Sequence, residues 1–75
     1  MEIKIGFVDS PRELSITMEG SQEDLAGRIH DALSQTQGTL DLQDTKGHRF
    51  IIRNERIAYV ELGKGQARPV GFAGI

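Results

Sequence analysis

Alternation of apolar and polar residues recurs along this chain, and it constrains the fold more than any other feature of the sequence. The alternating segments are residues 2–8, 13–19, 39–43, 48–53 and 57–62. A period of two places successive side chains on opposite faces of an extended strand, so each segment predicts a strand with an apolar face, and residues 57–62 carry apolar side chains on both faces. Five short strands in a chain of 75 residues leave room for one domain, spanning residues 1–75.

One segment with helical spacing lies between the second and third strands. The apolar residues spaced for one face of this helix are Leu25, Ile29, Ala32 and Leu33. They predict a helix over residues 22–36. Ser21 followed by Asp24 resembles a capping box at its start, and Gly38 is expected to end it in the left-handed conformation.

Turn residues separate the predicted strands. Residues 9–12 predict the first turn, since Pro11 directly after Ser10 suits position i+1, and residues 44–47 predict a tight hairpin in which Gly47 supplies a positive φ. Residues 68–72 could form a short sixth strand, which Pro69 would confine to an edge of the sheet.

The order of these elements is β-β-α-β-β-β. A single helix among runs of strands predicts the α+β class, with an antiparallel sheet of about five strands and the helix packed on one face. The predicted core consists of Ile3, Ile5, Phe7, Leu14, Ile16, Met18, Leu25, Ile29, Leu33, Leu40, Leu42, Phe50, Ile52, Val60 and Leu62.

The face of the sheet opposite the helix should be polar, but the sequence predicts apolar residues there. Ile57 and Tyr59 alternate with Val60, and Ile51 adds a third apolar side chain from the preceding strand. Either the sheet curls into a small barrel that buries both faces, or a second copy of the chain covers the apolar face. We expect the second arrangement, a homodimer through these three residues, because a domain this small gains much stability from a partner. A different protein partner would fit the same surface.

Charge is distributed unevenly along the chain. Residues 1–44 carry three basic and nine acidic side chains, whereas residues 45–75 carry six basic and two acidic ones. The basic candidates for binding RNA or another polyanion are Lys46, Arg49, Arg53, Arg56, Lys64 and Arg68. Tyr59 could stack a base among them. The acidic pI of about 5.6 and the single tyrosine make nucleic acid the less favoured partner.

Few residues point to catalysis. Gly63, Lys64 and Gly65 could approach a phosphate, but Pro69 follows too closely for the helix that a phosphate-binding loop requires. His30 and His48 lack a third ligand at useful spacing. We therefore expect no catalytic residue, no metal and no cofactor, and interpret the chain as a binding module rather than an enzyme.

The absence of cysteine excludes disulfides, thiolate nucleophiles and sulfur-ligated metals. No basic segment followed by a long apolar run begins the sequence, and no apolar run is long enough to span a bilayer. We therefore expect a cytoplasmic protein that does not enter the membrane.

Several strings of residues occur together in a familiar combination. They are Lys4-Ile5-Gly6, Asp9-Ser10-Pro11-Arg12-Glu13-Leu14, Asp44-Thr45-Lys46-Gly47, Ile57-Ala58-Tyr59-Val60-Glu61-Leu62-Gly63 and Val70-Gly71-Phe72. Together they resemble a family of small actinobacterial proteins of unknown function, over about residues 2–72. Some members carry an ATP-binding label, so the resemblance implies nucleotide binding as a further candidate function. The family's proline-containing link before the last strand is replaced here by residues 53–56.

Overall fold

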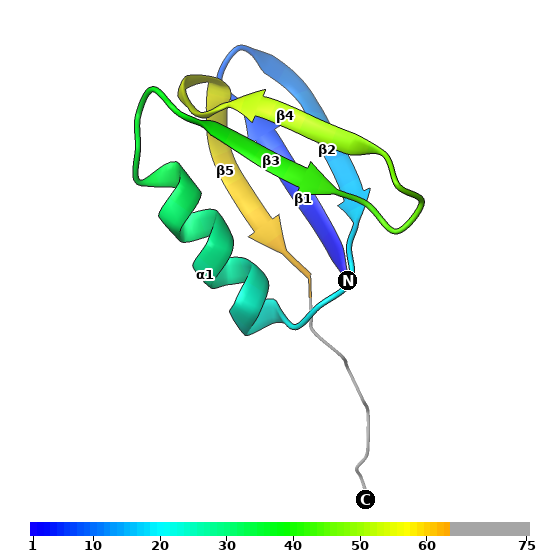
Figure 1. Ribbon diagram of the computed structural model, residues 1–75. Helices are drawn as coiled ribbons and strands as arrows, with labels where there is room; N and C mark the ends of the chain where they lie inside the picture. Colours follow the sequence, from blue (N-terminus) through cyan, green and yellow to red (C-terminus); the bar gives the residue numbers. More distant parts are fainter. Residues whose placement is uncertain (64–75) are drawn as a thin grey trace, which may run out of the picture.

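The computed structural model describes residues 1–63, and residues 68–72 lie outside this part of the chain. The elements are β1 (Glu2–Phe7), β2 (Ser10–Thr17), α1 (Gln22–Leu33), β3 (Thr39–Gln43), β4 (Arg49–Arg53), the 3₁₀ turn η1 (Asn54–Arg56) and β5 (Ile57–Leu62). Figure 1 shows their arrangement. The predicted α+β class and the order β-β-α-β-β-β are confirmed.

The strands divide into two antiparallel sheets, whereas the sequence led us to expect one. The first sheet has the order β2-β1-β5, and the second is the β3–β4 hairpin. The turn η1 follows β4 directly and redirects the chain, so that β5 pairs with β1 and Val60 lies opposite Ile5. The two sheets lie in separate layers, and α1 lies beside β3 (Figure 1).

A single core lies between the two sheets and the helix. Its buried residues are Ile3, Ile5, Ile16, Met18, Leu25, Ile29, Leu40 and Leu42, all of which alternation or helical spacing predicted. Ile3 and Ile5 on the central strand β1 are completely buried. Each such side chain contributes about 1.5–3 kcal/mol relative to an exposed position. The other predicted core residues pack half-buried around this cluster.

The helix begins where the sequence predicts and ends earlier. The Ser21 hydroxyl accepts a hydrogen bond from the backbone N–H of Asp24 at 3.1 Å, as a capping residue does. The helix ends at Leu33, and Gly38 is not in the left-handed region, so the predicted end was wrong. The cause is Asn54 on η1, whose Nδ2 donates to the carbonyls of Ala32 and Gln35 at 2.9 and 2.7 Å. These bonds satisfy carbonyls that a longer helix would have used.

The first turn is tighter than predicted, and the second is as expected. Residues 8 and 9 alone form the turn, so Pro11 lies within β2. Proline is tolerated there because β2 is an edge strand. In the β3–β4 turn, Gly47 has a φ of 91°, and the Asp44 carboxylate accepts from the backbone N–H groups of Lys46 and His48.

We predict that Asn54→Asp destabilises the fold. The substitution removes two hydrogen bonds and places a carboxylate against carbonyl oxygens at the negative end of the helix dipole. We expect the free energy of unfolding to fall by about 2–4 kcal/mol, measured by urea denaturation. Glu55→Gln, on the exposed neighbour, should change it by less than about 0.5 kcal/mol. Equal stability of the two variants would contradict the role of Asn54.

Candidate functional site

The three apolar residues predicted to form one interface lie in three different environments. Ile51 is 64% exposed on the outer face of the β3–β4 sheet. Tyr59 is 47% exposed on the outer face of the other sheet, and Ile57 is half-buried against the core. Because the two sheets share one core, their outer faces point away from each other, and the predicted continuous apolar face is absent from the described residues.

A bulge in β5 explains the position of Ile57. Gly6 of β1 pairs with Tyr59, and the next residue, Phe7, pairs with Ile57, which leaves Ala58 as an extra residue. An extra residue in one strand interrupts the alternation of its side chains. Ile57 therefore turns toward the core while Tyr59 turns outward, so the prediction that both share one face was wrong.

Tyr59 spans the outer face of the three-stranded sheet. Its ring lies over Gly6 of β1, where a Cβ atom would overlap with ring carbons Cε2 and Cζ. Its hydroxyl donates a hydrogen bond to the carboxylate of Glu13 on β2. The side chain thus links β5 to β2 across β1, and glycine at position 6 is what lets the ring lie flat on the sheet.

Two of the basic candidate residues are bound to carboxylates. Nε and Nη2 of Arg49 donate to the two carboxylate oxygens of Asp41 at 3.0 and 2.7 Å, and this hydrogen bonding lowers the pKa of Asp41. Arg56 donates a single hydrogen bond, from Nη1, to the carboxylate of Asp9. Each pair joins one residue from the acidic half of the sequence to one from the basic half, so the charge asymmetry of the sequence is partly cancelled in space.

The other basic candidates are dispersed. Lys46 lies in the β3–β4 turn, and Arg53 lies beside Ile51 on the outer face of β4. Neither has an ion-pair partner within residues 1–63. Lys64 and Arg68 lie outside the described part of the chain. The six predicted residues are therefore not brought together as one basic patch by the described structure.

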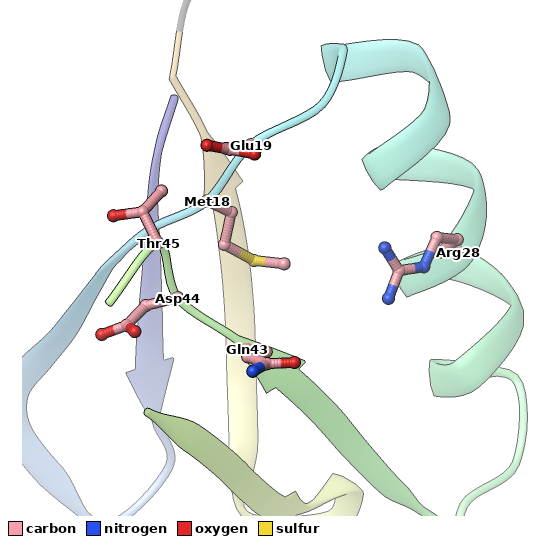
Figure 2. A pocket seen from close by; sticks show the side chains of 6 residues that line it. All are labelled: Met18, Glu19, Arg28, Gln43, Asp44 and Thr45. Carbon is pink, nitrogen blue, oxygen red and sulfur yellow. The ribbon is translucent and has the colours of Figure 1, made fainter. Parts of the chain in front are cut away.

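A groove that the sequence did not reveal runs between α1 and β3. Ile29 and Ala32 line one side of it, and Leu40 and Leu42 line the other, around a volume of about 360 Å³. A second hollow adjoins the groove at Arg28, near the end of β3, where Met18, Glu19, Gln43, Asp44 and Thr45 line it. Figure 2 shows the Arg28 side chain reaching from the helix toward the strand. Helical spacing placed Ile29 in the core, but nothing local to Arg28 indicated that a groove lies beside it.

The histidines do not form a metal site in the described structure. His48 Nδ1 lies 3.2 Å from the Asp44 carboxylate, and His30 is an exposed residue of α1. No group of three or more histidine, aspartate or glutamate side chains positioned for a metal ion occurs within residues 1–63. In the same part of the chain, no helix is long and apolar enough to cross a membrane.

We predict that the pKa of Tyr59 lies above the ordinary value of 10.0, because its hydrogen bond to Glu13, and then burial, favour the protonated phenol. The stability that this bond supplies should be lost as the pH rises through the raised pKa. Tyr59 is the only tyrosine, so an ultraviolet absorbance titration reads it directly.

Glu13→Ala should lower that pKa toward 10.0, whereas Glu23→Ala on the helix should leave it unchanged. Identical titration curves for the wild type and the Glu13 variant would show that Glu13 does not hold the tyrosine hydroxyl.

Comparison of the sequence with known proteins identifies the family of this chain. No protein with a curated description matches the sequence. Residues 1–73 match the model of a family described as a protein of unknown function, DUF3107. This match covers almost the whole chain, including every strand and the helix described above. The chain therefore belongs to the DUF3107 family.

Proposed function

We propose that this domain acts by binding rather than by catalysis, through protein–protein contacts, and that it forms a homodimer. The observation that carries the proposal is Ile51, an isoleucine 64% exposed at the centre of β4. Within residues 1–63, β4 has β3 as its single neighbour, so its outer edge also carries unpaired backbone groups. An exposed apolar side chain on such an edge is typical of an association surface.

The proposed contact is two-fold, with Ile51 of one copy packed against Ile51 of the other. Arg49 lies on the same face and would bring positive charge to the contact, but Asp41 holds its guanidinium at 2.7 Å and offsets that charge. Ile57 lies against the core and Tyr59 lies on the other sheet. The contact we propose is therefore centred on Ile51, without these two residues.

Binding of RNA or another polyanion by residues 46–68 is the second candidate. Lys46 and Arg53 favour it, since no carboxylate pairs with them in the described residues. Arg49 and Arg56 weaken it, since an anion would have to displace Asp41 and Asp9. A filter-binding titration at two salt concentrations distinguishes the candidates, because phosphate contacts weaken steeply with salt.

Nucleotide binding is the third candidate, and it depends on Lys64, which lies outside the described residues. An increase in melting temperature with ATP that is lost in Lys64→Ala would support it. The actinobacterial origin and the cytoplasmic location expected from the sequence also remain predictions.

We predict that the wild-type chain dimerises at micromolar concentration and that Ile51→Thr weakens this dimer at least about tenfold, as the loss of a buried apolar contact would. Threonine is also β-branched, so the strand should keep its conformation. Analytical ultracentrifugation across a concentration series measures both dissociation constants.

Val8→Thr is the matched control, because Val8 is 60% exposed but lies in the β1–β2 turn, where its backbone bonds Arg56 of η1, and not on the outer face of β4. It should leave the dissociation constant unchanged. A wild-type chain that stays monomeric at high micromolar concentration, or equal effects of the two substitutions, would contradict a dimer through Ile51.

A further inference from the structure

Within residues 1–63, the edge of β3 that faces away from β4 has no strand partner, and just beyond the end of β3 the N–H of Thr45 donates to the carbonyl of Thr17 at 3.0 Å. At the two ends of the hairpin, the N–H of Asp44 donates to the carbonyl of His48 at 2.9 Å, and the N–H of Asn54 donates to that of Gly38 at 3.0 Å. Antiparallel strands alternate between residues that bond their neighbour and residues that do not. The even-numbered residues of β3 therefore bond β4, and the N–H and C=O groups of residues 39, 41 and 43 point toward the open edge.

The groove described above runs along this same edge. Its apolar lining comes from Ile29 and Ala32 on the helix and from Leu40 and Leu42 on the strand. An extended peptide placed there would continue the sheet through backbone hydrogen bonds, and every second side chain would face the apolar lining. The groove thus offers backbone partners for strand addition and, beside them, a shallow apolar seam for alternate side chains, since Ile29, Leu40 and Leu42 are core residues that expose only 5%, 2% and 2% of their surface.

The charged side chains beside the groove determine which peptide it would bind. Arg28 lines the groove and the hollows beside it along β3, and it has no ion-pair partner within residues 1–63. The nearby carboxylate of Asp41 is held by Arg49, and that of Asp44 accepts backbone N–H groups in the turn. Asp31 lines the groove and Glu19 lines the hollow that adjoins it, so a strongly acidic peptide would be repelled. One carboxylate placed at Arg28 is therefore the favoured arrangement.

We propose that the groove between α1 and β3 binds an extended segment of a partner protein as an added strand. That segment carries apolar side chains at alternate positions and one carboxylate, on the same face, that pairs with Arg28. This site lies on the opposite edge of the hairpin from Ile51, so it is independent of the proposed homodimer.

The test is a titration of the ¹⁵N-labelled full chain with the peptide acetyl-Thr-Val-Thr-Glu-Thr-Val-Thr-amide, followed by NMR. We expect the amide signals of residues 39, 41 and 43 to shift together with those of α1 around Arg28. The peptide with Gln in place of Glu should bind about three- to fivefold more weakly. Arg28→Gln should remove this difference, and Arg12→Gln, which changes an exposed arginine on β2, should preserve it.

The proposal fails if millimolar peptide shifts none of these signals, if the shifts map elsewhere, or if the Glu and Gln peptides bind equally. It also fails if the amide signals of residues 39, 41 and 43 shift with protein concentration in the absence of peptide, because a second copy would then occupy the edge. Sedimentation of the Arg28→Gln variant distinguishes a failure of the peptide site from a failure of the proposed homodimer, because this substitution should leave the homodimer intact.

Discussion

Burial of the inner face of β1 is the interaction on which the rest of the structure depends. Ile3 and Ile5 are completely buried, and they meet the inner faces of β3 and of the helix in one core. A domain of this size has no second core. Both sheets therefore bury their apolar faces in this one core. A binding partner must then contact the outer face of a sheet, an unpaired strand edge or the groove between α1 and β3.

The β3–β4 hairpin is the part of the fold in which these surfaces are concentrated. It forms a sheet of its own, so within residues 1–63 each strand has one neighbour and one open edge. The edge of β4 adjoins the exposed Ile51, and the edge of β3 adjoins the groove beside Arg28. The three-stranded sheet contrasts with it, because Tyr59 and Glu13 connect its outer strands across β1. The proposed binding function therefore depends on the hairpin, with its exposed Ile51 and its unpaired strand edges within residues 1–63.

Local patterns predicted the local structure well. Alternation identified each strand, the serine at position 21 identified the start of the helix, and Gly47 identified the hairpin turn. Each of these signals acts within a few residues, where side-chain direction and backbone conformation depend on neighbours in the chain.

Features that depend on distant partners could not be predicted in this way. The helix ends early because Asn54, from the segment after β4, satisfies its last carbonyls. The bulge at Ala58 appears only when β5 is paired with β1, and it removed Ile57 from the predicted interface. The ion pair between Arg49 and Asp41 and the groove beside Arg28 likewise require knowing which strands and helix are adjacent.

Native-state hydrogen exchange of the full chain tests the open hairpin most directly. We predict slow exchange for the amides of residues 40 and 42, which bond β4, and fast exchange for those of residues 39, 41 and 43. Protection of all five successive amides in the dilute protein would contradict it, because β3 would then have a partner on both sides.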